Sequence, residues 1–459
     1  MGKIVAILAL ALIAFAGFAQ TPAESASPSS ASGALGFAAG LNLGTDVLIT
    51  GYDASHNPIM GTWSRLGFQP DLHFGKFGVG LDLTVHFQLY PSPDQAVSIY
   101  PGDWIPDYNG SGKSFFDLYL AKILYVRYGL KGEDSFYVKL GSINNLTLGD
   151  GFVMDDYSNM LFLPTTRIFG LDLGLDGNLF GFPYVGFELV TGNLARLDVS
   201  GGRVYVRPLA GTSIPILKDM QVGGTLVVDT NPYLYSQTET GASPVAVFGG
   251  DVLVPIIGGT TFPLAAFADM AVDPNKSLGT MIGAGGRLLS VITYGAQLRF
   301  LQDGFIPSYF DTNYDIYRAQ KYDYMQNTPA GSSFFSGWLG SLGLSVLKDA
   351  IALSAELDGP FAAIPAVATT NQTDYPHAKA VFTLAQGVLG GFFIDASYEK
   401  YYLGQNKSFF QDLIDPTNAV VGMDINYKTG ASVLTLAYNA KWQNNDWVVT
   451  SSISASMQF

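Results

Sequence analysis

The chain has 459 residues, no cysteine, and 38 acidic against 24 basic side chains, which gives a formal net charge of −14. Only 14% of its residues are charged, against about a quarter in ordinary soluble domains, and 48% are hydrophobic. These values exclude disulfides and cysteine chemistry. They also argue against a nucleic-acid partner, because phosphate binding needs clustered Lys and Arg.

Residues 1–19 have the layout of a secretory signal peptide. Lys3 gives a basic start, residues 4–18 form an apolar run, and Gly17 and Ala19 supply small residues before Gln20. The run is short for a helical span of about 20 residues, which favours cleavage over a membrane anchor. Residues 20–34, rich in Ser and Ala, are predicted to form a short spacer.

From residue 35 onward, the dominant pattern is alternation of apolar and polar side chains. Between residues 81 and 89 the two sets are Leu81, Leu83, Val85, Phe87 and Leu89 against Asp82, Thr84, His86 and Gln88. The same alternation recurs in residues 351–358, 421–427 and 449–459. Each segment is about 10 residues long, which is the length a tilted strand needs to cross a bilayer.

Residues 35–459 are therefore predicted to form one large antiparallel transmembrane β-barrel of about 18–20 strands. No apolar run after the signal is long enough for a helical span without Asp, Pro or a glycine pair. A strand in hydrocarbon cannot leave its edge unpaired, so repeated spanning strands imply closure. Short connections, such as residues 131–134 and 428–430, alternate with long ones, such as residues 149–166 and 303–333. A soluble β-sandwich or propeller is the alternative fold.

The last strand carries a family resemblance. Its end, Ile453-Ser454-Ala455-Ser456-Met457-Gln458-Phe459, alternates into a terminal aromatic residue. It resembles the terminal signature of Gram-negative outer-membrane β-barrels. The resemblance implies location in the bacterial outer membrane, contact with its lipid, and recognition of Phe459 by the barrel-assembly machinery. It identifies the superfamily, which includes porins, and no individual family.

Residues 149–166 are the predicted pore constriction. They combine Asp150, Asp155 and Asp156 with apolar residues that an exposed loop rarely carries, among them Phe152, Val153 and Met154. The segment resembles the long loop that narrows the lumen of general porins. Its carboxylates, set against Arg167, Arg203, Arg207 or Arg299, would form a filter that favours cations. A lid packed on the barrel rim is an equal alternative.

Two further groups of residues are predicted from their phase and composition. Inward-facing polar side chains would form the lumen wall, or simply a hydrated surface: Asp82, His86, Lys139, Arg299, Glu356, Asp395 and Asp424. Aromatic residues in long loops would form a recognition surface for sugars or proteins, or else part of an aromatic girdle: Tyr309, Tyr314, Tyr317, Tyr322 and Trp104.

The predicted function is diffusion of ions or small hydrophilic solutes through a porin-like outer-membrane channel. A substrate-specific transporter, and an adhesin or receptor displayed on a barrel, are the alternatives. No nucleophile elbow, phosphate loop or zinc-protease motif occurs, so no enzyme activity, cofactor or metal is expected. A homo-oligomer is compatible with the sequence.

Overall fold

The computed structural model describes residues 35–52, 58–92, 95–110, 114–161, 168–236, 241–259, 261–328, 334–347, 349–369, 372–429, 432–443 and 446–458. The predicted signal peptide, the spacer, Arg167 and Phe459 lie outside these residues. Within the described residues, no helix is long and apolar enough to cross a membrane.

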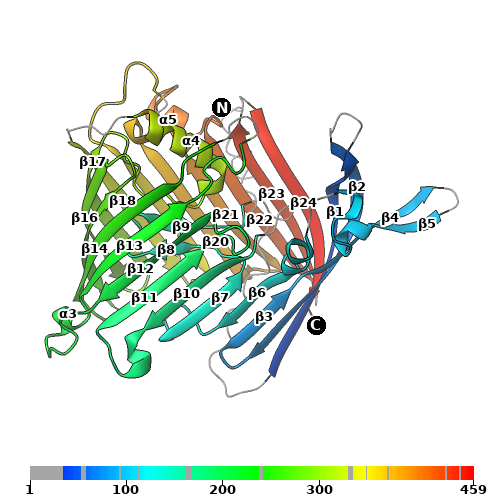
Figure 1. Ribbon diagram of the computed structural model, residues 1–459, viewed down its shortest axis with the longest axis horizontal. Coiled ribbons are helices and arrows are strands. Elements are labelled where there is room, and N and C mark those ends of the chain that lie inside the picture. The colour runs from blue at the N-terminus through cyan, green and yellow to red at the C-terminus, as the bar shows by residue number, and fades with distance from the viewer. Residues whose placement is uncertain are drawn as a thin grey trace.

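Strands dominate the described chain (Figure 1). In chain order they are β1 (Leu35–Tyr52), β2 (Pro58–Phe74), β3 (Phe77–Leu81), β4 (Leu83–Ser92), β5 (Gln95–Ile99), β6 (Ile123–Tyr128), β7 (Phe136–Gly141), β8 (Leu146–Leu148), β9 (Met154–Tyr157), β10 (Gly170–Asp176), β11 (Val185–Thr191) and β12 (Val199–Val206). They continue as β13 (Gln221–Asp229), β14 (Val245–Ile257), β15 (Leu264–Val272), β16 (Leu278–Leu288), β17 (Ile292–Gln302), β18 (Phe334–Val346), β19 (Ile351–Pro360), β20 (His377–Leu389), β21 (Phe392–Lys400), β22 (Ala419–Thr429), β23 (Ser432–Gln443) and β24 (Asp446–Gln458).

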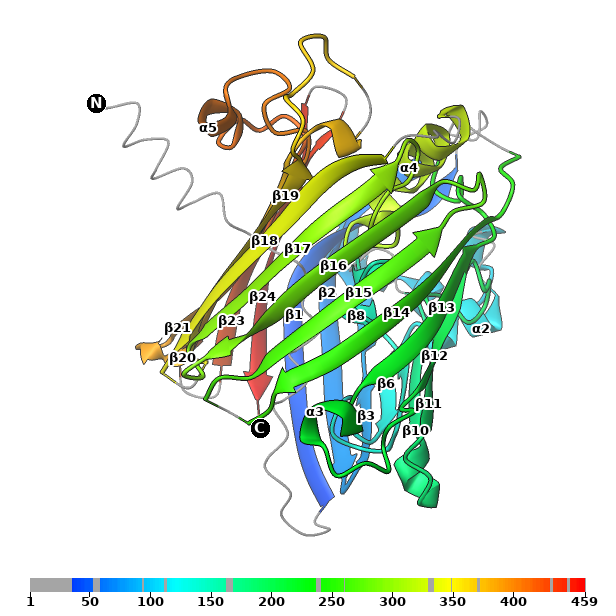
Figure 2. The same cartoon turned by 90° about the vertical axis from the view of Figure 1, so that its left-hand side faces the viewer.

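The helices are short and lie in the connections. They are α2 (Phe115–Leu120), α3 (Pro215–Lys218), α4 (Tyr314–Asn327) and α5 (Phe409–Asp412), with 3-10 turns η1 (Pro101–Asp103), η2 (Tyr108–Gly110), η3 (Gly177–Phe180) and η4 (Gln372–Asp374). Figure 2 shows α4, α5 and the long loops at one end of the strands, and α3 and the C-terminus at the other. Most long connections lie at the end that carries α4 and α5, but residues 207–220, which include α3, form a long connection at the opposite end, and residues 273–277 form a short one between β15 and β16.

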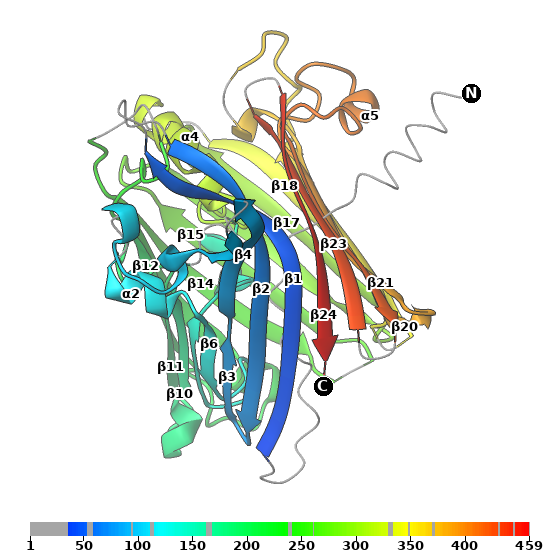
Figure 3. The ribbon, with the colours of Figure 1, turned by 90° about the vertical axis from the view of Figure 1, so that its right-hand side faces the viewer.

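The strands form one antiparallel sheet in which chain neighbours pair. The sheet has 22 strands among the described residues, and β8 with β9 forms a separate two-stranded sheet. The first strand pairs with β2 along its length and also with β24, from Gly40 opposite Gln458 to Leu43 opposite Ala455. Figure 3 shows β1 beside β24 at the end where the C-terminus lies.

The strand number differs from the predicted 18–20 for a local reason. The run predicted over residues 81–89 is interrupted at Asp82, whose N–H donates to the carbonyl of Lys122, and both β3 and β4 pair with β2. In the described chain, β5 pairs only with β4, as the outer half of a hairpin. If β3 and β4 count as one interrupted strand and β5 is set aside, twenty strands remain along the sheet.

The two faces of the strands differ as the alternation predicts. In β17, Leu298 and Phe300 are exposed, whereas Arg299 between them is buried. In β18, Leu342 and Leu344 are exposed while the intervening Gly343 is buried. This is the reverse of a soluble protein, in which charged side chains face water and leucines form the core. The all-β, antiparallel fold class is confirmed, with an apolar outer face.

Candidate pore constriction

The segment between β7 and β10 leaves the sheet and folds against its inner face. The Asn159 side chain joins the two ends of this segment to each other and to the wall. Its Oδ1 accepts a hydrogen bond from the Ile143 N–H at 2.8 Å, and its Nδ2 donates one to the Gly192 carbonyl at 2.9 Å. A Cβ atom on Gly170 would lie 2.8 Å from the Asn159 amide, so only glycine fits there. The two chain ends of this inward segment are thereby joined to the wall strands.

A second inward segment, from β17 to the end of α4, packs on the first. The Ser308 N–H donates to the Phe152 carbonyl at 2.9 Å, and the Asp155 N–H donates to the Phe310 carbonyl at 3.0 Å. Met154 and Phe310 form an isolated parallel bridge. We call these two segments, residues 142–161 and 303–328, the plug.

The plug has an apolar core of its own. Phe152 stacks on Phe305 with ring centroids 5.4 Å apart, and both side chains are almost fully buried. The same cluster includes wall residues Val190, Val199, Val227, Val247 and Met281. Burial of each large apolar side chain stabilises the assembly by roughly 1.5–3 kcal/mol. Apolar residues of this segment, such as Phe152, Val153 and Met154, are thus buried between the plug and the wall strands.

Ion pairs anchor α4 to the wall. Arg318 donates through Nε to Asp229 at 2.6 Å and through Nη1 to Asp198 at 3.0 Å. The hydroxyl of Tyr314 donates to the same Asp229 carboxylate at 2.6 Å. Asp229 is fully buried, so its charge is stable only because these donors surround it.

Burial changes the pKa values of carboxyl groups in the plug. It raises the pKa of Asp150 to about 6, with a further rise from Asp251 and an opposing effect of Arg203. It raises the pKa of Asp315, in α4, to about 7 against the opposing charge of Arg318. Desolvation penalises the charged form of each group, and the neighbouring cations compensate only in part.

The structure brings most of the predicted constriction residues together. Asp150, Asp155 and Asp156 all lie in the plug. Arg203 lies beneath it: a Cβ on Gly149 would be 3.2 Å from Arg203 Nε, and that nitrogen donates to Asp251 at 3.0 Å.

Arg207 is a correction to the predicted constriction. It follows β12 and forms an ion pair with Asp176 at the short-turn end of β10, with 2.5 Å between Nη2 and Oδ2. It lies beyond the end of the strand that carries Arg203, and a carboxylate next to a turn already neutralises it. Arg207 therefore takes no part in the constriction.

The predicted wall residues are buried or half-buried within the described strands. Asp82, His86, Arg299 and Asp424 are buried, and Lys139, Glu356 and Asp395 are half-buried. Several are held by partners: Arg65 donates to Asp82 at 3.1 Å, and His86 lies between Asp46 and Asp103 at 3.0 and 2.8 Å. Their role in a pore remains a prediction.

The predicted tyrosine recognition surface is corrected. Tyr309, Tyr314 and Tyr322 are buried in the plug core and are not available to a partner outside the protein. Tyr317 is half-buried, with its ring 4.8 Å from that of Tyr401. Trp104 is also half-buried, and Lys122 Nζ lies 3.7 Å from its ring centroid. The physical reason is that these aromatic side chains remove apolar area from water when they pack against each other, whereas an exposed loop would leave that area in water.

Sequence reasoning missed the cations that meet the plug carboxylates. Lys379, in β20, pairs with Asp156 and donates to Thr312 at 2.8 Å. Lys321, in α4, donates to Asp311 at 2.6 Å. A signal for α4 was present, because Tyr314, Arg318, Lys321, Tyr322 and Met325 recur at helical spacing and all five are buried. Nothing in the sequence placed Lys379 beside Asp156.

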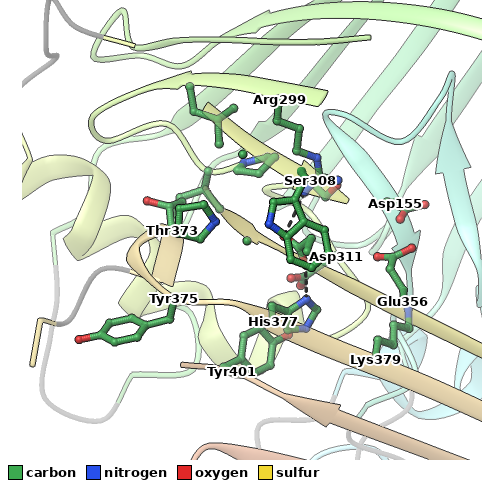
Figure 4. Close-up of a pocket in the computed structure, with 18 of the residues that line it drawn as sticks. Asp155, Arg299, Ser308, Asp311, Glu356, Thr373, Tyr375, His377, Lys379 and Tyr401 are labelled. Atoms are coloured by element: carbon green, nitrogen blue, oxygen red, sulfur yellow. Dashed lines mark hydrogen bonds and ion pairs between the residues drawn. The ribbon is translucent and has the colours of Figure 1, made fainter. Parts of the chain in front are cut away.

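A row of paired charged side chains extends across strands β17 to β21, next to the plug (Figure 4). Asp358 accepts from Arg299 at 3.1 Å and lies 2.9 Å from His377 Nδ1. The other ring nitrogen of His377 lies 3.0 Å from Glu399, which also accepts from the Tyr401 hydroxyl at 2.6 Å. The described residues hold no group of three or more His, Asp or Glu arranged for a metal ion.

Comparisons with known proteins give fold-level likenesses only. No protein-family model and no curated protein matches the chain. Similar solved structures include Pseudomonas aeruginosa OpdK with vanillate (11% identity, 93% of this chain, 98% of that chain, TM-score 0.32). They also include P. aeruginosa OccK2 (OpdF) in complex with glucuronate (8%, 93%, 96%, 0.33). A third is Escherichia coli Wzi, an outer-membrane carbohydrate-binding β-barrel (11%, 92%, 84%, 0.36). At these scores the likenesses assign neither family nor solute.

Proposed function

We propose that the chain is an exported outer-membrane channel through which ions and small hydrophilic solutes diffuse past the plug. The strands close into a transmembrane barrel through the pairing of β1 with β24, and the C-terminal strand is recognised by the assembly machinery. The observation that carries the proposal is the inverted wall: exposed apolar side chains such as Leu342 outside, and buried charged ones such as Arg299 inside. A wall of this kind separates hydrocarbon from a polar lumen.

The plug indicates that the lumen of the proposed channel is narrow, because it occupies part of the interior. In a barrel of about twenty strands, side chains alone cannot fill the interior. Here two loops fill part of it, and they pack against the inner face of the wall from β11 to β17. The charged side chains where the plug meets β17 to β21 line part of the space beside the plug.

The charges at that point favour cations. Carboxylates outnumber cationic groups where the plug meets the wall: Asp155, Asp156, Asp311, Glu356, Asp358 and Glu399 against Arg299, Lys321, His377 and Lys379. An excess of fixed negative charge in a narrow polar passage raises the local concentration of cations. We therefore propose a cation-preferring channel.

The test is the reversal potential of purified protein in a planar bilayer under a KCl gradient. The double variant Asp155→Asn and Asp156→Asn is expected to shift selectivity toward anions, because two charges disappear and Lys379 loses its partner. The matched control is Asp219→Asn with Asp349→Asn, which removes two exposed carboxylates near the short turns. Unchanged selectivity in the first variant contradicts the filter, and absence of any current contradicts the channel.

A further inference from the structure

A small cavity lies where the plug meets the wall. Its volume is about 100 Å³, and its lining comes from the plug and from strands β17 to β21. Figure 4 shows Asp155 and Glu356 on one side of it, Arg299 above and His377 below. A space of this size holds several water molecules or one small organic group.

The cationic groups that line this cavity already have carboxylate partners. Arg299 and His377 are both paired with Asp358, and His377 is also paired with Glu399. Lys321 is paired with Asp311, and Lys379 with Asp156. An anionic ligand would have to compete with these internal carboxylates for every cation.

Three acceptors in the same lining remain unsaturated. Glu356 makes no hydrogen bond or ion pair to any described residue, although its charge interacts with those of Asp358, Asp155, Arg299 and His377. Asp155 accepts one hydrogen bond, from the Thr147 hydroxyl at 2.9 Å, and has no ion pair in the described chain. The Oδ1 atom of Asp311 is buried and has no hydrogen-bond partner. A buried carboxylate oxygen without a donor is costly, and the half-buried carboxylates of Glu356 and Asp155 can accept further hydrogen bonds, so the lining favours a ligand that supplies N–H groups.

The acceptors are held in place from two directions. Asp155 is fixed by its backbone bond to Phe310, and Gly151 leaves room for it: a Cβ there would be 3.0 Å from the Asp155 carboxyl carbon. Glu356 is fixed by the register of β19, opposite Ser341 on one side and Lys379 on the other. The site therefore exists before a ligand arrives, which lowers the entropic cost of binding.

We infer that this cavity binds the ammonium group of small organic amines and that such amines are solutes of the channel. A primary ammonium carries one positive charge and three N–H donors, which suits a cavity lined by carboxylates that can accept further hydrogen bonds. A bare metal ion is a poorer match, because the described residues hold no set of three or more ligands arranged for one. That amines pass through the protein rests on the proposed channel, whereas their binding rests on the cavity alone.

The test uses the full chain folded in detergent and titrated with 1,6-diaminohexane in a calorimeter. We expect saturable binding, with no heat from 1,6-hexanediol, which has the same length without the charge. Glu356→Gln and, separately, Asp155→Asn are each expected to weaken binding about tenfold, as loss of one charge-assisted contact does. The matched control Glu133→Gln, at an exposed turn residue, is expected to bind as the parent does.

A second measurement separates this inference from the channel itself. In planar bilayers, the diamine is expected to reduce the K⁺ current of the parent protein and to reduce that of Glu356→Gln less. No diamine binding in the calorimeter overturns the inference, and so does binding that both substitutions leave unchanged. A silent bilayer together with saturable, Glu356-dependent binding would overturn the proposed channel and support the ammonium site.

Discussion

At the scale of single residues, the interior is organised by pairing of charges. His377 touches two carboxylates, Asp229 collects donors from Arg318 and Tyr314, and Arg203 meets Asp251. Buried charges persist only when they are paired, since an isolated one costs several kcal/mol. Asp150 departs from this rule, because its buried Oδ2 atom has no hydrogen-bond partner.

Asp150 predicts a pH dependence of selectivity. Burial raises its pKa to about 6, so the group is ionised above that pH and neutral below it. As pH falls from about 7.5 to 5, the lumen loses this negative charge, and the cation preference measured by reversal potential is expected to fall. In Asp150→Asn, the change over this window is expected to be smaller. An equal change in parent and variant would contradict the assignment.

At the scale of elements, α4 belongs to the plug, and buried ion pairs of Arg318 hold it against the wall. Its buried face carries Tyr314, Arg318 and Tyr322 toward β12, β13 and the plug core. Because Arg318 is deeply buried, the helix needs the carboxylates of Asp229 and Asp198 to balance its charge. Asp229 is the last residue of β13, and Asp198 directly precedes β12. The helix and these strands are therefore expected to be stable only together.

Replacement of Arg318 by Met tests this dependence. The substitution leaves Asp229 buried without its cation, which is expected to cost about 3–5 kcal/mol. Unfolding by urea in lipid vesicles gives the free energy, and limited proteolysis within residues 314–327 reports release of the helix. The double variant Arg318→Met with Asp229→Asn is expected to recover much of the loss. A double variant no more stable than the single one would contradict the pairing.

Sequence patterns predicted the strands better than the plug. Period-two alternation is a local property, and the burial of side chains along β14 and β17 follows it. Phe152, Val153 and Met154 indicated that this loop is buried, but the sequence left a lumen constriction and a lid on the rim as equal alternatives. The burial of Tyr309, Tyr314 and Tyr322 was not, because tyrosine suits both a binding surface and a core.

At the scale of the whole molecule, the protein exposes leucine around its outside. Leu342 is 62% exposed in the interior of β18, and Leu347 is 67% exposed at the short turn that follows. In a bilayer these two positions differ in depth. The same substitution at each is therefore expected to have different costs.

Leu342→Arg and Leu347→Arg measure that difference. An arginine on the lipid face is expected to cost about 2–4 kcal/mol near the bilayer midplane and about 0–1 kcal/mol near the interface. The free energy of unfolding in lipid vesicles is the measurement, with the Leu347 variant as the matched control. Equal costs at the two positions would contradict a membrane-spanning wall.

The sequence by itself determined the antiparallel all-β fold and the apolar face of strands with clear alternation, such as β17, because alternation is read residue by residue. Only the tertiary structure decided that two loops separated by about 150 residues pack into one plug, and that Lys379 meets Asp156 while Arg207 turns away to Asp176. Whether two loops far apart in the sequence touch depends on where the strands between them place each loop in space. That position follows from the register of the intervening strands taken together, and no local pattern encodes it.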